Sequence, residues 1–271
     1  MIDYEKICLK VCQLVRQTGV FIQDEGLNFN RDKIEVKGVH DLVSYVDKEA
    51  EQQLVKGLSL LLPEAGFITE EKTINKIGEI FTWIIDPLDG TTNFMHGLPV
   101  YSISIALMQQ QELVIGVVLE LNRDELFYAF KDGPAMLNSN KIQVSTINKM
   151  GESLIATGFP YSDFKEIDAY LGLMKRMMVE GQGLRRLGSA AIDLCYVACG
   201  RFETYFEFNI NSYDVAAGMF ILQQAGGRFT TFKASEPAPW DIYKSRQILA
   251  SNGLIHDAML DILNSDFLNK I

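Results

Sequence analysis

Two aspartates three positions apart, Asp86 and Asp89, interrupt an apolar run and lead into Gly90 and Thr91. Carboxylate oxygens are the ligands that magnesium, manganese and calcium prefer, whereas zinc favours nitrogen and sulfur. Glycine lets a backbone approach a ligand closely, and threonine suits the first turn of a short helix whose free N–H groups can receive phosphate oxygens. The stretch Trp83–Phe94, WIIDPLDGTTNF, therefore predicts a metal site beside a phosphate-binding turn.

The residues before these aspartates predict a buried strand. Trp83, Ile84 and Ile85 are apolar, and Pro87, which has no backbone donor, is expected to end sheet pairing. Asp86 then lies at the carboxyl end of a strand, where ligands of α/β proteins collect. Asp, Pro and Gly are also the residues of ordinary turns, so the aspartates taken alone could be purely structural.

The full motif D-P-x-D-G-T-T-N-F resembles the signature of the inositol monophosphatase family. These magnesium-dependent, lithium-sensitive phosphatases are related to fructose 1,6-bisphosphatase and the 3'-nucleotidases. The haloacid dehalogenase type of phosphatase differs, because its aspartates are spaced differently and include a covalent nucleophile. Three further segments match in the family's order and extend the resemblance over essentially the whole chain: Asp41–Asp47, Glu70-Glu71 and Tyr213–Gly218.

The resemblance implies two magnesium sites. One metal would be held by Glu70, Asp86 and the backbone carbonyl of Leu88. A second would be held by Asp86, Asp89 and Asp214, so that Asp86 bridges the two. The alternative for Asp214 is an ordinary acidic residue at a helix start, which the helix dipole favours.

The resemblance also implies how water and phosphate are handled. The proton of the attacking water would pass either to Glu70 or to the Asp47–Thr91 pair. The phosphate would be held by the N–H groups of Gly90 and Thr91, with Asp89 beside the substrate. Taken without the motif, Asp47 is an ordinary exposed helix residue, because it lies off the centre of an apolar stripe.

Two more segments are candidates for contact with the rest of the substrate. Gly188, Ser189 and Ala190 resemble the family's turn into a helix, where backbone groups meet the sugar or polyol. Glu207 matches the family's hydroxyl-binding glutamate. Its alternative is an outward-facing strand residue, which the alternation of neighbouring side chains fits nearly as well.

The sequence departs from the well-known animal enzymes near the substrate. Tyr213 stands where tryptophan is usual, Asn211 replaces a histidine, and the loop from Gly158 to Ser162 offers no clear counterpart to a substrate-binding serine. The hydrolytic residues are unaffected by these departures. The choice of substrate is left open.

The predicted function is hydrolysis of inositol monophosphate or a related small phosphate ester by direct attack of metal-activated water. The alternatives are a 3'(2'),5'-bisphosphate nucleotidase or a fructose-1,6-bisphosphatase of the same superfamily. Thr92 favours the inositol type, since the nucleotidases usually carry a charged residue there. Outside catalysis, a metal-binding homologue or a calcium-stabilised scaffold would keep the same ligands.

Composition excludes several other classes of protein. A net charge of −10 over 271 residues argues against nucleic acid or an anionic membrane as partner. The start of the chain lacks the pattern of a signal peptide and no apolar run approaches a membrane span, so a cytoplasmic location is expected. A homodimer is a separate expectation. The cysteines pair as Cys8 with Cys12 and Cys195 with Cys199, a spacing that favours buried free thiols over zinc.

The elements expected around the site give a mixed α/β fold. The resemblance implies a layered α-β-α-β-α sandwich in one catalytic domain, 1–271, with an N-terminal lobe of about 1–148 and a C-terminal lobe of about 149–271. Glu49, Glu51 and Glu71 are interpreted as structural, the first two on a solvated helix face. The hydrophobic pattern predicts helices over residues 7–21 and 41–62, an antiparallel meander over 101–144, strands 153–157, 204–208, 228–232 and 247–251, and helices 165–180, 189–199, 214–225 and from 256.

Overall fold

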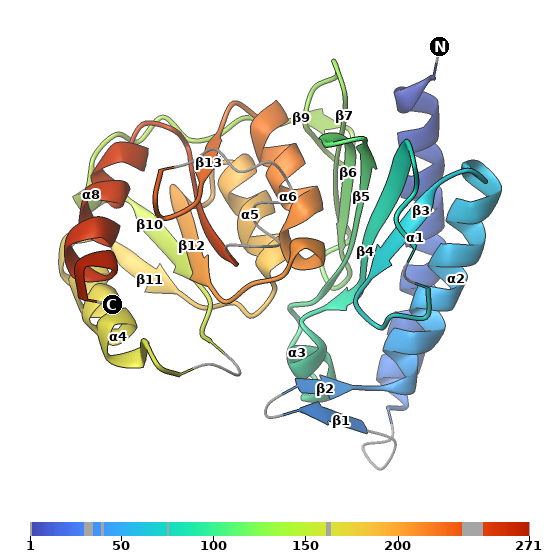
Figure 1. Cartoon of the computed structure of the whole chain (residues 1–271), viewed down its shortest axis with the longest axis horizontal. Coiled ribbons are helices and arrows are strands. Elements are labelled where there is room, and N and C mark those ends of the chain that lie inside the picture. Colours follow the sequence, from blue (N-terminus) through green and yellow to red (C-terminus); the bar gives the residue numbers. More distant parts are fainter. Residues whose placement is uncertain are drawn as a thin grey trace.

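The structure, a computed structural model, describes residues 2–29, 35–38, 41–74, 76–160, 164–234 and 246–270. Its elements form five layers, alternating helices and sheets (Figure 1). This is the predicted α-β-α-β-α sandwich. The helices of the described ranges that build the layers are α1 (Tyr4–Leu27), α2 (Tyr45–Leu61), α3 (Thr91–Met95), α4 (Ile167–Glu180), α5 (Ala190–Ala198), α6 (Ser212–Gln224) and α8 (His256–Asp266).

The larger sheet has the strand order β3-β4-β5-β6-β7-β8-β9. Strands β3 and β4 are parallel, and every later neighbour pairs antiparallel, which confirms the predicted meander. Helices α1 and α2 cover one face and α6 packs on the other (Figure 1). The strands are β3 (Gly66–Thr69), β4 (Phe81–Asp89), β5 (Ser102–Gln109), β6 (Glu112–Glu120), β7 (Glu125–Phe130), β8 (Met136–Leu137) and β9 (Asn140–Lys141).

The smaller sheet has the order β11-β10-β12-β14-β13 and is mixed. Strand β10 pairs parallel with both neighbours, whereas β12, β14 and β13 pair antiparallel. Helices α4 and α8 form the outermost layer beside it (Figure 1). The strands are β10 (Leu154–Thr157), β11 (Gly183–Arg185), β12 (Thr204–Phe208), β13 (Arg228–Thr230) and β14 (Gln247–Ser251).

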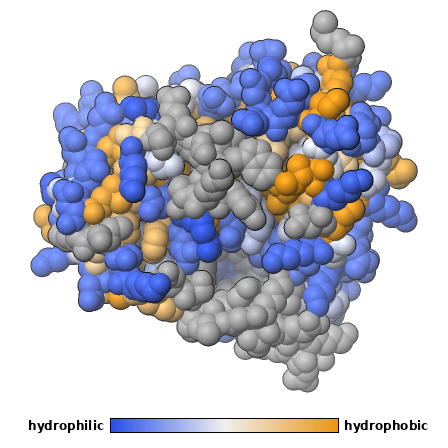
Figure 2. All heavy atoms as spheres, in the orientation of Figure 1, coloured by the Kyte–Doolittle hydropathy of each residue, from blue (hydrophilic) through white to orange (hydrophobic). Residues whose placement is uncertain are grey.

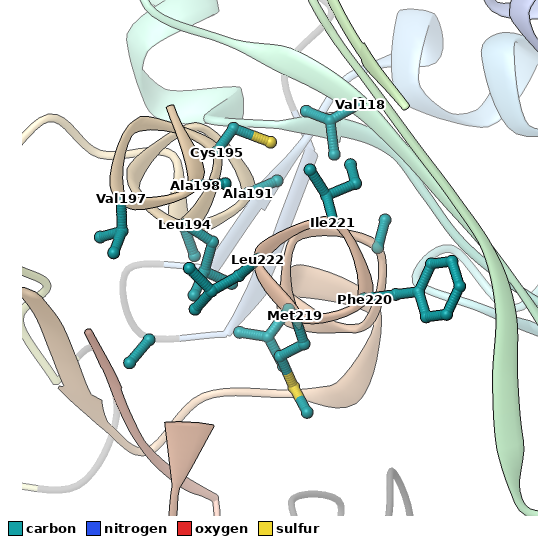
Figure 3. Close-up of a cluster of buried hydrophobic side chains, with 14 of the residues drawn as sticks. Val118, Ala191, Leu194, Cys195, Val197, Ala198, Met219, Phe220, Ile221 and Leu222 are labelled. Atoms are coloured by element: carbon teal, nitrogen blue, oxygen red, sulfur yellow. The ribbon is translucent and has the colours of Figure 1, made fainter. Parts of the chain in front are cut away.

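Helices α5 and α6 form the central layer, where the largest apolar cluster lies. Figure 3 shows Leu194 and Leu222 between the two helices and Ile221 on the side of α6 toward Val118 of the larger sheet. All four side chains are fully buried. This packing fixes the starts of α5 and α6, which carry Ser189 and Asp214, relative to the sheet that carries Asp86.

Two predictions about the first half of the chain are wrong. Strand β4 does not stop at Pro87, because pairing with β5 resumes at Asp89 after an irregularity between Asp86 and Asp89. Proline lacks only the N–H group, and a bulge needs no ladder bond at that point. The predicted helix 41–62 begins at Tyr45, after a short strand β2 (Asp41–Val43) that pairs with β1 (Glu35–Gly38), because Ser44 caps the helix there.

The exterior fits the acidic composition. On the face shown in Figure 2, hydrophilic side chains dominate the described surface and the apolar ones form small separate patches. No helix in the described ranges combines the length and hydrophobicity that a bilayer span needs. The thiols of Cys8, Cys12 and Cys195 are buried and free, and that of Cys199 is partly buried and free, as predicted.

Gly116 allows strand β6 and helix α6 to approach closely. A Cβ at this position would lie 2.6 Å from the Ala217 carbonyl oxygen, so alanine would force strand and helix apart. We expect Gly116→Ala to lower the free energy of unfolding by about 1–3 kcal/mol, measured by urea denaturation. Gly151→Ala is the control, because its nearest atom would be an ordinary 3.8 Å away. Equal stability of the two variants would show that the contact at Gly116 is not tight.

Candidate functional site

A cavity of about 500 Å³ collects the residues that the sequence singled out. It is bounded by the end of β4, the segment after β3, and the starts of α5 and α6. Asp47 is the one predicted site residue outside the cavity wall, and it contacts the wall through Thr91. The predicted residues that line the cavity are Glu70, Asp86, Leu88, Asp89, Gly90, Thr91, Gly188, Ser189, Ala190, Glu207 and Asp214.

Three carboxylates from separate segments, those of Glu70, Asp86 and Asp214, form the acidic end of this cavity. Glu70 shares a hydrogen bond with Asp86, and its pKa is held well above the usual range by burial and by the charge of Asp214. Burial and the charge of Glu70 raise the pKa of Asp86 likewise, and Asp86 is 2% exposed. Like charges gathered in a poorly solvated place are the environment that a divalent cation stabilises.

The donor set fits a hard cation. It consists of carboxylate and carbonyl oxygens, which magnesium prefers, and contains no thiolate or imidazole. No three acidic, histidine or cysteine side chains of the described ranges have the geometry of a preformed metal shell.

The irregular end of β4 turns both aspartates toward the cavity. Asp86 Oδ1 accepts the N–H of Leu88 at 3.0 Å, which closes a tight turn around Pro87. Gly90 follows with φ of +99°, and a Cβ there would lie 2.9 Å from the Val100 carbonyl oxygen. Only glycine adopts this backbone without strain, so the position starts the predicted short helix α3 directly after the aspartates.

Asp89 is held by the start of α5. Its Oδ2 accepts the Ser189 hydroxyl at 2.6 Å and the N–H of Ala191 at 2.8 Å. Burial raises the pKa of Asp89 to about 6, although these hydrogen bonds act in the opposite direction. The structure thereby brings the predicted turn at Gly188–Ala190 against the predicted metal motif.

Asp47 is a buried residue, which excludes its interpretation as an exposed helix position. It is 0% exposed and accepts hydrogen bonds from the N–H of Ser44 at 2.9 Å and the Ser44 hydroxyl at 2.6 Å. Its other oxygen accepts the Thr91 hydroxyl at 3.0 Å. Burial raises its pKa against these bonds. A buried carboxylate with raised proton affinity next to a cavity hydroxyl suits a proton acceptor.

Asp214 is a helix-start residue that also lines the cavity. Its Oδ2 accepts the N–H of Asn211 at 2.7 Å, so it caps the start of α6. It also lines the cavity, where burial and the charge of Asp89 hold its pKa well above the usual range. The cap orients the carboxylate and leaves one oxygen outside that bond.

Glu207 points inward, so its interpretation as an outward-facing strand residue is wrong. It is buried, lines the cavity, and accepts a hydrogen bond from the Tyr205 hydroxyl. Gly158 allows this position, because a Cβ there would lie 2.0 Å from the Glu207 carboxylate. Burial raises the pKa of Glu207 to about 7.

The structure adds charged wall residues that sequence reasoning missed: Lys72, Arg186, Asp193 and Arg246. Arg186 and Arg246 line the cavity, and Arg186 lies over the Phe159 ring at 5.3 Å. Asp193, in the first turn of α5, is 2% exposed and its Oδ1 has no hydrogen-bond partner in the described structure. The only sequence signal for Asp193 was its place one helical turn after Ser189.

The positions that depart from the animal enzymes lie at the same cavity. Asn211 and Tyr213 line it beside Asp214. Gly158 lies against Glu207, but residues 161–163 of the following loop are outside the described ranges. The described departures therefore lie on the wall of the cavity that holds Asp214 and Glu207.

The sequence pattern predicts Glu51 on a solvated helix face, and this prediction is wrong. The side chain is 0% exposed and accepts hydrogen bonds from residues 71 and 73. Helical spacing alone could not reveal it, because its partners are backbone groups of a distant loop. Glu49 is exposed, as predicted.

Comparison with known proteins gives consistent matches. The sequence model of the inositol monophosphatase family matches residues 3–267. An inositol-1-monophosphatase of Synechocystis is 41% identical over 233 residues, covering 85% of this chain and 80% of that protein. The Nus factor SuhB of Haemophilus influenzae is 38% identical over 234 residues, covering 85% and 86%. The crystal structure of the extragenic suppressor protein SuhB from Bartonella henselae superposes with a TM-score of 0.87 at 34% identity, covering 96% and 98%.

Proposed function

Because the chain belongs to the inositol monophosphatase family, a family of phosphatases, we propose that it is a magnesium-dependent phosphomonoesterase acting on inositol monophosphate or a related small phosphate ester. The observation that supports this most is the meeting of Glu70, Asp86, Asp89 and Asp214 at one cavity beside the Asp47–Thr91 pair. A scaffold has no need of a buried proton acceptor linked to a cavity hydroxyl. We propose water as the direct nucleophile, without a covalent phosphoenzyme.

The proposed magnesium ligands are those named from the sequence. Glu70, Asp86 and the Leu88 carbonyl would hold one ion, and Asp86, Asp89 and Asp214 a second. Bound magnesium would supply Lewis-acid stabilisation of phosphate charge and lower the pKa of an attacking water.

The chain's own groups provide the proton path. The Thr91 hydroxyl lies 3.0 Å from Asp47 Oδ1 and 3.0 Å from the Leu88 carbonyl oxygen. A hydroxyl donating to Asp47 keeps lone pairs with which it can accept a proton from water in the cavity. As Thr91 accepts the proton of the water, its own hydroxyl proton passes to Asp47, which is buried and does not meet the water directly. Glu70 is the competing acceptor, since its pKa is also raised.

The proposed substrate contacts come from strand β12 and the start of helix α5, which also line the cavity. Glu207 would accept a hydroxyl hydrogen bond from the leaving group, and Gly188, Ser189 and Ala190 would position it from the start of α5. This wall favours a polyol over a simple alkyl group. We also propose that the protein works as a cytoplasmic homodimer, which sedimentation velocity and cell fractionation can check.

A panel of phosphate esters tests the function. We expect phosphate release that requires magnesium, stops in excess chelator and is inhibited by lithium, because the ligand set is hard oxygen and resembles that of lithium-sensitive relatives. The panel should include inositol 1-phosphate, fructose 1,6-bisphosphate and 3'-phosphoadenosine 5'-phosphate, ranked by kcat/KM. Calcium in place of magnesium is the control, because a calcium-stabilised scaffold should release no phosphate with either ion. Full activity in excess chelator would contradict the proposed magnesium-dependent function.

Removing the Glu207 carboxylate tests substrate recognition. Glu207→Ala should lose roughly 1–3 kcal/mol in kcat/KM for inositol 1-phosphate, because a hydroxyl of the bound substrate loses its acceptor. A simple aryl phosphate without that hydroxyl should lose much less, and it serves as the internal control. Equal losses on both substrates would mean that Glu207 shapes the fold and does not contact the substrate.

A further inference from the structure

Two acidic residues of helix α2, one turn apart, hold two different segments of the site. Asp47 accepts the Thr91 hydroxyl at 3.0 Å. Glu51, four residues later on the same helix face, accepts hydrogen bonds from the segment that follows Glu70. Helix α2 therefore contacts both the turn that directly follows Asp89 and the segment that begins with Glu70.

The contacts of Glu51 are close and buried. Its Oε2 accepts the N–H of Glu71 at 2.8 Å. Its Oε1 accepts the N–H of Thr73 at 2.9 Å and the Thr73 hydroxyl at 2.6 Å. A carboxylate that is 0% exposed is stable only when hydrogen bonds replace its lost hydration. Helix α2 and this segment are thus held together by one group.

The segment after β3 is tied to the sheet at its ends and to Glu51 in its middle. The N–H of Glu70 donates to the Ile85 carbonyl at 3.2 Å. On the return, the Thr69 hydroxyl donates to the Ile74 carbonyl at 3.0 Å. Glu71 and Thr73 lie between these points, so the Glu51 carboxylate fixes the backbone directly after Glu70.

We propose that Glu51 is a positioning residue that fixes the backbone directly after Glu70, so that Glu70 and Asp86 can bind the same divalent cation. Glu51 is not part of the cavity wall and acts through its hydrogen bonds to Glu71 and Thr73. The inference rests on the proposed function, because it takes Glu70 as a metal ligand. It adds that metal affinity is set in part from helix α2.

Glu51→Gln tests this with little change in shape. The glutamine carbonyl can still accept from Thr73, but its NH₂ group faces the N–H of Glu71, so that bond is lost. We expect amide hydrogen exchange at Glu71 to speed up at least about tenfold in the metal-free protein. Calorimetric titration with magnesium alone should give a Kd at least about tenfold weaker. Activity at saturating magnesium should recover most of its normal value.

Two conservative variants at Thr73 test one of the hydrogen bonds to Glu51 if Glu51→Gln does not fold. Thr73 is exposed, so Thr73→Val should fold while losing the hydroxyl donor to Glu51. Thr73→Ser keeps that donor. We expect magnesium binding to weaken severalfold in the valine variant and to remain normal in the serine variant. Equal binding by both would overturn the contribution of this bond and with it the proposal.

Glu203→Gln is the matched control. Glu203 is also a buried carboxylate, accepts the N–H of Leu154 at 2.6 Å, and lies outside the cavity wall. It should lower the melting temperature and leave the magnesium Kd unchanged. If the unsubstituted protein binds magnesium and Glu51→Gln behaves like Glu203→Gln, the inference fails alone. If the unsubstituted protein binds no magnesium, the proposed function fails and the inference fails with it.

Discussion

Asp214→Asn should lower phosphate release at least about 10²-fold and at the same time raise the melting temperature of the metal-free protein. The loss of activity follows if Asp214 is a metal ligand. The gain in stability follows from the charges in the cavity, since burial and Asp89 hold the pKa of Asp214 well above its ordinary value. Asparagine removes that charge and keeps an oxygen that can accept from Asn211.

Paired melting curves in chelator and in magnesium measure this. Magnesium should raise the melting temperature of the unsubstituted protein more than that of Asp214→Asn, because at a given concentration a tighter ligand stabilises the folded state more. Asp168→Asn is the control, an exposed acid in the first turn of α4. It should show a slight loss of stability in both buffers and normal turnover. If Asp214→Asn behaves in that way, Asp214 is only a helix cap.

The pH dependence of the metal-free protein should have the corresponding sign. A carboxyl group whose pKa is raised in the folded state lowers stability as the pH rises from its unfolded-state pKa to its folded-state pKa. Above the folded-state pKa it lowers stability no further. The pKa of Asp89 is raised to about 6 and that of Glu207 to about 7. Stability in chelator should therefore fall between about pH 4 and 7, less steeply in Asp214→Asn.

Much of the site could be predicted because its chemistry is local in sequence. The spacing of Asp86, Asp89 and Gly90 contains the turn, the ligands and the helix start within a few residues, and the structure keeps that order. The bulge around Pro87 was missed, because a missing N–H group is compatible with either an ended strand or an irregular one. Tertiary pairing with β5 decides between them.

The missed residues act across long separations. Glu51 has the helical spacing of a solvent-facing residue. Its backbone partners, however, are the N–H groups of Glu71 and Thr73, which lie 20 and 22 positions away in the sequence. Arg186 and Asp193 reach the cavity only because α5 packs beside α6. No local pattern contains that information. Distant partners such as Asp47 and Thr91 could be predicted only through the family resemblance, which did not extend to Glu51.

Two substitutions, one at each proposed proton acceptor, should have large effects on turnover. Glu70→Gln and Thr91→Ala should each lower kcat by about 10²-fold or more while substrate still binds, as expected when a proton transfer is lost. Asp47 is 0% exposed, so the Thr91 hydroxyl at 3.0 Å is its link to the cavity. Thr91→Ser keeps that link and is the matched control, expected to stay near normal.

The two variants also distinguish the two acceptors. Glu70 is a proposed metal ligand as well as a proposed base, so kcat must be measured at magnesium concentrations that saturate each variant. If saturation restores Glu70→Gln while Thr91→Ala stays inactive, the proton passes to the Asp47–Thr91 pair and Glu70 serves the metal. If Thr91→Ala turns over normally and Glu70→Gln does not, Glu70 is the base. Inactivity of both at saturation would mean that Glu70 and Thr91 orient the same water, since each alone then leaves it misplaced.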